Sequence, residues 1–138
     1  MFGYPARIQK QPDGHVVSFR DIPEALTAGA TRQQAVDMAA DALATAMEFY
    51  FEDRRHVPLP SQARKGETVI DLPASVAVKV LLLNEMLKEN ITPSKLARKL
   101  EASPQTVTRI VDLHHATKID TLADAFKAIG KTLTFSVA

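Results

Sequence analysis

The sequence contains no cysteine and no tryptophan, and it has no long hydrophobic run. Without cysteine the chain can form no disulfide and no thiolate zinc site, and it has no cysteine nucleophile. No stretch approaches the roughly 18 consecutive apolar residues of a membrane span. Residues 1–20 carry early charges and strand-like alternation where a secretory signal would have an apolar core. We therefore expect a cytoplasmic protein that does not enter a membrane.

The small net charge of +1 hides a difference between the two halves of the chain. Residues 1–71 contain 8 basic and 10 acidic side chains, a net charge of −2, whereas residues 72–138 contain 9 basic and 6 acidic ones, a net charge of +3. A chain of 138 residues with 46% hydrophobic content is long enough for two small globular domains. The charge pattern favours a basic partner for the first half and an anionic partner for the second.

Residues 1–72 are predicted to form a small β-β-β-α-β domain. Tyr4–Lys10 and His15–Phe19 flank a Pro-Asp-Gly turn, which is typical of a β-hairpin. Short strands are also expected at Ala25–Gly29 and, after the helix, at Thr68–Leu72. The order of elements therefore indicates an α+β fold.

A long helix is expected between the third and fourth strands. Thr31 and Gln34 have the spacing of a capping box, so the helix should begin at Arg32 and end near Asp53. Its apolar residues recur at intervals of three and four, as expected for a helix that packs on a sheet. The predicted stripe consists of Val36, Ala39, Ala40, Leu43, Met47 and Tyr50.

Residues 73–138 are predicted to form an all-α domain that ends in a strand. The expected helices are Ala74–Asn90, Pro93–Leu100, Pro104 to about Leu113, and Thr121–Ile129. In Lys131–Val137 the residues Leu133, Phe135 and Val137 alternate onto one face, which predicts a strand. No neighbouring strand is expected in this half, so we predict pairing with the same strand of a second copy and a homodimer or higher oligomer. The alternative is that the strand folds back onto the N-terminal sheet.

The segment Pro93–Ile110 has the spacing of a helix-turn-helix. Ala97 provides the small side chain that two closely crossing helices need, and Ser103 followed by Pro104 is a good start for the second helix. The outward positions of that helix carry glutamine, threonine and arginine, which can recognise base edges. The residues predicted to contact DNA are Lys95, Ser103, Gln105, Thr106, Thr108, Arg109, His115 and Lys118.

Several motifs along the chain carry a family resemblance. They are the Val-Ser-Phe-Arg-Asp-Ile-Pro-Glu-Ala of Val17–Ala25, the aromatic Phe49–Asp53, the Pro58–Ser61 turn and the His-His segment Leu113–Asp120. The helix-turn-helix resembles the Xre type of phage-repressor domain, with Thr121–Gly130 as its closing helix. The whole chain resembles HicB antitoxins. It departs from the usual helix-turn-helix pattern at Glu101, where a glycine is common, and at Ala102, where a larger aliphatic residue is common.

This resemblance implies a fold and a function. The N-terminal domain would be a partial RNase H-like fold that covers a small basic HicA toxin, an mRNA-cleaving enzyme. The C-terminal domain would repress the antitoxin's own operon by binding its operator, and the predicted dimer would call for a palindromic operator. We expect no enzymatic activity and no cofactor for the antitoxin itself.

Acidic residues of the first half are candidates for binding the toxin. Four of them lie within a sector of about 60° on the long helix, and this line along one helix is a poor metal cage but could face a basic partner. The predicted toxin-binding residues are Asp21, Ile22, Glu24, Asp37, Asp41, Glu48 and Glu52. His114 and His115 lack the ligand spacing of a metal site.

Two function classes remain open from the residues. One is an antitoxin that binds both a protein and DNA. The other is a transcriptional regulator whose N-terminal domain senses a small molecule.

Overall fold

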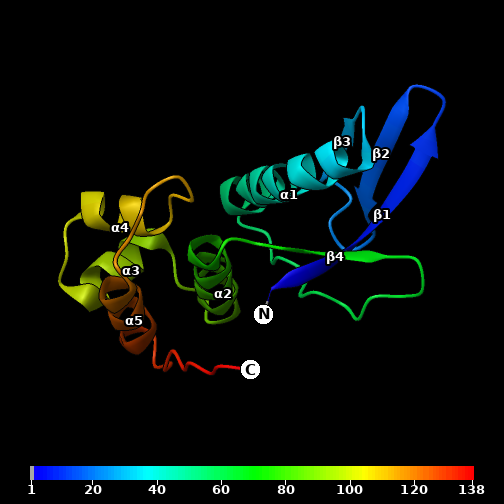
Figure 1. The fold of residues 1–138 in the computed structure, drawn as a ribbon. Helices are drawn as coiled ribbons and strands as arrows, with labels where there is room; N and C mark the ends of the chain where they lie inside the picture. Colours follow the sequence, from blue (N-terminus) through cyan, green and yellow to red (C-terminus); the bar gives the residue numbers. More distant parts are fainter. Residues whose placement is uncertain (1) are drawn as a thin grey trace. The chain divides into compact units, whose positions relative to one another are not determined.

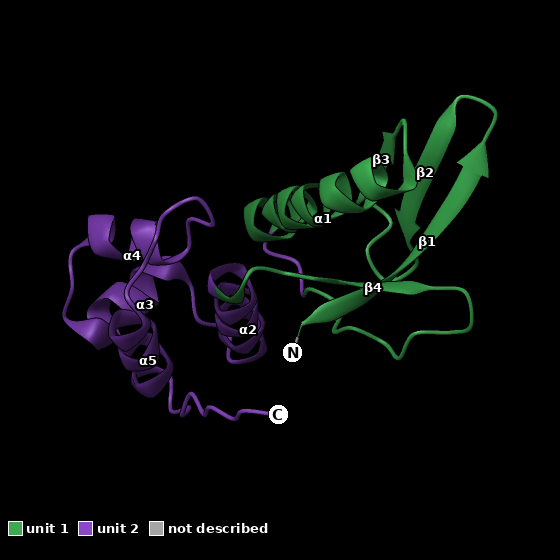
Figure 2. Ribbon diagram, in the orientation of Figure 1, with its two compact units in different colours: residues 1–53, 57–74 green, residues 54–56, 75–138 purple. Residues whose placement is uncertain are grey.

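The computed structural model describes residues 2–138, and these residues form two compact units (Figures 1 and 2). The first unit contains the residues up to Asp53 together with Val57–Ala74. The second unit contains Arg54–His56 and Ser75–Ala138. The chain therefore leaves the first unit briefly after its long helix and returns to it before the helical half begins.

The first unit is a four-stranded antiparallel sheet with one long helix. The strand order is β3-β2-β1-β4, so β1 and β2 lie in the middle of the sheet, and α1 contacts all four strands. The elements are β1 (Gly3–Gln11), β2 (Gly14–Phe19), β3 (Leu26–Gly29), α1 (Arg32–Asp53) and β4 (Thr68–Asp71). The β-β-β-α-β order predicted from the sequence is confirmed.

One face of the sheet forms the core of this unit. Ala6 on β1 pairs with Phe19 on β2, and Tyr4 on β1 pairs with Ile70 on β4. These four side chains and Val17 are all buried, because residues two apart on a strand and residues directly opposite on its neighbour point to the same face. The alternation of the sequence thus sets which face of the sheet is covered.

The buried face of α1 differs in part from the predicted stripe. Its buried residues are Ala35, Ala39, Leu43, Ala46, Met47 and Tyr50. Val36 and Ala40 are only partly buried, and alanines at 35 and 46 face the core in their place. The physical reason is close packing: Gly29 of β3 lies so near the helix that a Cβ built on it would be 2.5 Å from the backbone nitrogen of Ala35. The small side chain of Ala35 accommodates this approach.

The predicted capping box forms at the start of α1, with one change of partner. The Gln34 N–H donates to Thr31 Oγ1 at 3.1 Å. The return hydrogen bond comes from the Ala30 N–H, which donates to Gln34 Oε1 at 2.7 Å. Two amide groups that have no partner within the helix are satisfied in this way.

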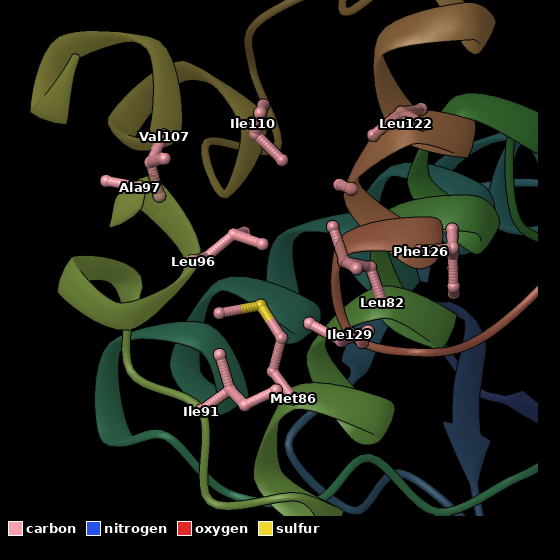
Figure 3. Close-up of a cluster of buried hydrophobic side chains, with 11 residues drawn as sticks. Leu82, Met86, Ile91, Leu96, Ala97, Val107, Ile110, Leu122, Phe126 and Ile129 are labelled. Carbon is pink, nitrogen blue, oxygen red and sulfur yellow. The ribbon is translucent and has the colours of Figure 1, made fainter. Parts of the chain in front are cut away.

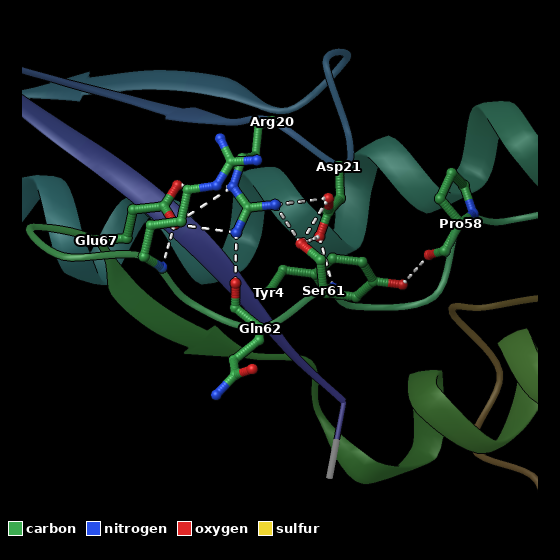
Figure 4. A network of polar contacts seen from close by, with 8 residues as sticks. Tyr4, Arg20, Asp21, Pro58, Ser61, Gln62 and Glu67 are labelled. Carbon is green, nitrogen blue, oxygen red and sulfur yellow. Dashed lines mark hydrogen bonds and ion pairs between the residues drawn. The ribbon is translucent and has the colours of Figure 1, made fainter.

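Polar contacts hold the loop of residues 57–67 to the end of β2 (Figure 4). The Arg20 guanidinium donates to both carboxylate oxygens of Glu67, from Nε at 2.9 Å and from Nη2 at 3.0 Å. The same Nη2 donates to the Gln62 carbonyl at 2.6 Å. Arg20 also donates to Ser61 Oγ, and the Ser61 N–H donates to Asp21 Oδ2 at 2.9 Å. One arginine therefore fixes three points of the loop.

Two titrating groups near this loop have shifted pKa values. The hydrogen bond from Arg20 lowers the pKa of the Glu67 carboxyl below its ordinary value, and the Arg64 N–H adds to the effect. The Tyr4 hydroxyl donates to the Pro58 carbonyl at 2.7 Å. Burial, together with the charge of Asp21, raises the pKa of that hydroxyl above its ordinary value.

The second unit consists of helices, as expected from the sequence. They are α2 (Ala74–Lys88), α3 (Pro93–Leu100), α4 (Pro104–Ile110) and α5 (Ile119–Ala128). Gly130 follows α5 with φ +78°, a left-handed conformation that favours glycine after a helix. Across residues 2–138, the structure contains no helix with the length and apolar character needed to cross a membrane.

The predicted C-terminal strand is not seen in the single chain: Lys131–Ala138 forms no regular secondary structure. The described part of the second unit offers this segment no strand with which to pair. Lys131 holds the start of the segment, since its Nζ lies 3.5 Å from carboxylate oxygens of both Glu85 and Glu89. Leu133 packs against the helical core, whereas Phe135 is 74% and Val137 100% exposed.

The Arg20–Glu67 contact predicts a pH dependence of stability. A carboxyl whose pKa is lowered by folding contributes stability above its unfolded pKa, and this contribution is lost as the pH falls through the folded pKa. Glu67→Gln should therefore lose less stability than the wild type between neutral pH and the acid range below the ordinary pKa of glutamate. Urea unfolding at a series of pH values measures this. Asp13→Asn, in the exposed β1–β2 turn, controls for the loss of one negative charge, and equal acid sensitivity of wild type and Glu67→Gln would contradict the prediction.

Candidate nucleic-acid interface

The helix-turn-helix forms as predicted, with α3 and α4 joined by a short turn. Leu96 and Ala97 of α3 meet Val107 and Ile110 of α4 in a buried cluster, and each of these side chains is at most 7% exposed (Figure 3). The cluster is completed by Leu82, Met86, Ile91, Leu122, Ala125, Phe126 and Ile129. α4 thus packs on α3 within a core to which α2, α5 and the segment before α3 also contribute.

Both helices begin with a hydrogen-bonded cap. The Thr106 N–H donates to Ser103 Oγ at 3.2 Å, which confirms Ser103 as the N-cap of α4. The Lys95 N–H donates to Thr92 Oγ1 at 3.2 Å and caps α3. Thr92 was not among the predicted cap residues, although its Thr-Pro sequence carries the same signal as Ser103-Pro104.

The turn between the helices contains a strained residue. Glu101 has φ 53° and ψ 41°, the left-handed conformation that glycine adopts most readily. This conformation closes α3, because the Glu101 and Ala102 N–H groups then donate to the Arg98 and Ala97 carbonyls. The departure from the usual glycine noted in the sequence therefore falls where a glycine would relieve strain.

The exposed face of α4 carries two long polar side chains that extend into solvent. Gln105 and Arg109 are exposed, four residues apart and hence on one face of the helix. Among residues 2–138 neither side chain has a hydrogen-bond partner in the structure. Thr108 Oγ1 donates to the Pro104 carbonyl at 3.0 Å, and the Thr106 and Ser103 hydroxyls lie 2.9 Å apart. Gln105 and Arg109 are therefore the side chains of this face that are best able to bind another molecule.

A hollow of about 220 Å³ brings four of the predicted DNA-binding residues together. Thr106 and Arg109 line it from α4, and His115 and Lys118 line it from the connection to α5. Lys95 lies outside this hollow, with its Nζ donating to the Asn90 carbonyl at 3.3 Å. The structure thus joins two separate parts of the sequence in one exposed, cationic surface.

Lys79 of α2 is a buried residue that the sequence analysis did not select. Its side chain is almost entirely buried, and the residue is 2% exposed. Its Nζ donates to the carbonyls of Arg109 at 3.1 Å, Asp112 at 2.6 Å and His115 at 2.7 Å. Burial lowers the pKa of this amine, and the Asp112 charge opposes the shift. A signal was present in the sequence, because Lys79 is the single charge within the apolar run of residues 72–83.

The predicted toxin-binding residues of the first unit fall into two groups. Ile22 is 0% exposed and packs in the core, so its side chain is not available to a partner. Both carboxylate oxygens of Asp21 accept from Ser61, and Asp21 therefore holds the loop. The surface group consists of Glu24, Asp37, Asp41, Glu48 and Glu52, of which Glu48 is partly buried and the others are exposed.

A shallow groove lies beside this acidic surface. It has a volume of about 290 Å³, and Glu24 and Asp41 contribute to its lining. Leu26, Met38 and Phe49 line it as well, although they are 66%, 44% and 48% exposed. The described residues of the chain contain no cluster of three or more histidine or carboxylate side chains able to hold a metal ion.

Comparisons with known proteins cover both units. The sequence model of a family described as HicB-like antitoxins of bacterial toxin-antitoxin systems matches residues 3–81. Antitoxin HicB 2 of Photorhabdus laumondii is 54% identical over 130 residues, which cover 94% of this chain and 92% of the relative. Antitoxin HicB of Escherichia coli is 50% identical over 132 residues, or 95% and 96% of the two chains. Antitoxin HicB of Pseudomonas fluorescens is 35% identical over 138 residues, or 99% and 94%.

Proposed function

The chain belongs to the HicB family of antitoxins, and from this premise we propose that its second unit binds operator DNA through α4 while its first unit covers a HicA-type toxin. As a HicB antitoxin it is not an enzyme. Family membership also decides between the two function classes left open by the sequence, in favour of the antitoxin. We further propose that the first unit corresponds to the partial RNase H-like fold that the family resemblance implies.

The exposed face of α4 is the observation that carries the DNA-binding proposal. Gln105 and Arg109 can form bidentate hydrogen bonds with adenine and guanine, and they project from a helix whose inner side is fixed in the core. His115 and Lys118 extend this surface and fit contacts to phosphate groups. Lys95 lies outside the hollow and fits the same kind of contact. These roles separate base recognition from positioning on the DNA backbone.

The hydroxyl residues of α4 have more limited roles. Thr108 already donates its hydroxyl proton to Pro104, so it offers its methyl group to a thymine methyl. One hydroxyl proton bridges Ser103 and Thr106, which leaves the other free to donate to a phosphate oxygen. We therefore assign these three residues to supporting contacts.

The acidic surface and groove of the first unit are the proposed toxin-binding surface. A protein interface commonly combines an apolar centre with a charged rim. Leu26, Met38 and Phe49 supply exposed apolar side chains, and Glu24 and Asp41 lie beside them. Asp37, Glu48 and Glu52 continue the negative charge along α1. A basic toxin, as the family resemblance implies, would complement this charge.

The C-terminal segment is the proposed contact between two copies of the chain. Phe135 and Val137 expose apolar side chains just beyond Leu133, which is anchored on the helical core. Burying these side chains against a second copy would remove apolar surface from water. A two-fold dimer would also present two α4 helices about 34 Å apart and would require a palindromic operator.

The DNA-binding proposal predicts different effects for two cations. Arg109→Ala should weaken operator binding by about 1–3 kcal/mol and relax specificity at one base pair, because a base contact is lost. Lys95→Ala should weaken binding to all sequences alike and lower the salt dependence by about one unit. Mobility-shift titrations on operator and scrambled DNA at several salt concentrations measure both effects. An equal loss on both DNAs for Arg109→Ala would remove the base-contact assignment.

The toxin-binding proposal predicts a charge effect on association. Asp41→Lys places a positive charge in the acidic surface and should slow association with the toxin by roughly tenfold at low salt. Stopped-flow binding to a catalytically inactive toxin measures this rate. Asp13→Lys makes the same change in the β1–β2 turn and should have little effect. If the two variants slow association equally, only the overall charge matters and the assigned surface is wrong.

The proposed self-association predicts an effect of two apolar side chains. The double substitution Phe135→Ser and Val137→Ser should convert the protein to monomers and weaken operator binding, because the two half-sites are then bound independently. Light scattering and mobility shifts measure these outcomes. Leu59→Ser, which removes a 57% exposed apolar side chain from the first unit, is the control. A double variant that stays dimeric would place the interface elsewhere.

A further inference from the structure

Lys79 joins α2 to the end of α4, the helix proposed to recognise DNA. A lysine that is 2% exposed has lost its hydration, and this is costly unless its ammonium group finds partners. The Lys79 Nζ has three carbonyl acceptors, from Arg109, Asp112 and His115, at 2.6–3.1 Å. An ammonium group has three N–H donors, whereas a neutral amine has two. The three acceptors can all be satisfied together only by the protonated side chain.

The carbonyl groups around Lys79 lie at the end of α4 and in the connection to α5. The Arg109 carbonyl lies in the last turn of α4, where the helix itself leaves carbonyls without amide donors. Asp112 and His115 lie in the connection to α5, which contains turns but no helix or strand. Two other hydrogen bonds reach the Arg109 carbonyl, from the Asp112 N–H at 3.3 Å and from Thr117 Oγ1 at 3.4 Å. The His115 N–H also donates to the Asp112 carbonyl, at 3.1 Å. Each of these hydrogen bonds is longer than the contact that Lys79 makes with the same carbonyl.

The connection held by Lys79 carries part of the proposed DNA surface. Arg109 and His115 line the same hollow. The Lys79 ammonium links these two residues, because it donates to the carbonyls of both. Lys118, a third residue lining that hollow, follows His115 by three positions. The position of the Lys79 ammonium therefore bears on the distance between the end of α4 and the residues His115 and Lys118 that follow it.

We propose that Lys79 is a positioning residue for DNA recognition, which fixes α4 and the connection of residues 111–118 in the arrangement that binds the operator. Lys79 does not touch DNA itself, because its ammonium group is enclosed by the three carbonyls. This inference rests on the proposed DNA-binding function. It gives a buried residue of α2 a role in holding the DNA-binding surface, which α4 and the connection to α5 form.

Lys79→Met in the full-length chain tests the inference, because methionine fills similar space and donates no hydrogen bond. We expect operator affinity per folded molecule to fall at least about tenfold, the scale of one lost bidentate base contact. Affinity for scrambled DNA should fall less, and the salt dependence of binding should stay at the wild-type slope, because no phosphate contact is removed. Fluorescence anisotropy gives the affinities, and chemical unfolding gives the folded fraction.

Two matched variants separate positioning from stability. Leu82→Ala creates a cavity in the same core without changing the three carbonyl contacts, and its operator affinity per folded molecule should stay near that of the wild type. Lys88→Met makes the same substitution at an exposed lysine of α2 and should also be near wild type. If Lys79→Met matches Leu82→Ala once the folded fraction is taken into account, Lys79 is only structural and the inference is wrong.

A milder variant covers the case in which Lys79→Met does not fold. Lys79→Gln keeps two N–H donors and should give an intermediate loss of operator affinity. Amide hydrogen exchange of Lys79→Gln without DNA should be faster than that of the wild type in residues 111–118. In α3 the two proteins should exchange at the same rate. Unchanged exchange in residues 111–118 would overturn the inference whatever the DNA result. If the wild type shows no preference for its operator and Arg109→Ala changes nothing, the proposed DNA-binding function itself fails.

Discussion

The second unit depends on the close crossing of α3 and α4. Ala97 lets the two helices approach, and Val107 and Ile110 fill the space behind them, so these three side chains are nearly excluded from water. Because α4 has seven residues, its own hydrogen bonds would not keep it folded in isolation. Its shape and direction come from this contact. A helix held from behind can present its outer face with little conformational freedom left to lose on binding.

Two energetically unfavourable features lie close to α4, and each helps to set the position of this helix. Glu101 adopts a left-handed conformation without being glycine, and Lys79 is a charge enclosed in the unit. Strain and buried charge persist in a protein when the surrounding structure compensates for them. Here the turn gains hydrogen bonds that close α3, and the ammonium gains three carbonyls. Stability and orientation of the helix-turn-helix are therefore linked.

Most of the fold could be predicted from the sequence because local signals agreed with one another. The Pro-Asp-Gly turn, the Thr31–Gln34 spacing and the Ser103-Pro104 pair each marked an element boundary that the structure confirms. The C-terminal strand is not seen in the single chain because alternation describes a preference of side chains, while a strand also needs a partner for its backbone, and the partner predicted for it is a second copy. Alternation alone could not supply that partner.

The residues of the candidate site could be predicted where they lie on one face of a helix, and less well elsewhere. Gln105 and Arg109 follow from helical periodicity once α4 is placed. The loop contact of Asp21 did not, because it joins residues 40 positions apart in sequence. The burial of Ile22 also depends on the folded chain and not on its own position in the sequence. Lys79 escaped selection for a similar reason: its three acceptors are backbone carbonyls, and a sequence does not show which carbonyls a fold will bring together.

The close approach of Gly29 to α1 has a consequence for how the edge strand is aligned. β3 has four residues and no fully buried side chain, so its hydrophobic pattern says little about which residue should pair with which. A slip of one position would bring Ala28 or Ala30 to the place of Gly29, where a Cβ would meet the backbone of Ala35 at 2.5–2.8 Å. Neither alternative fits unless the helix moves. The alignment of this strand is thus selected by excluded volume at a single residue that has no side chain.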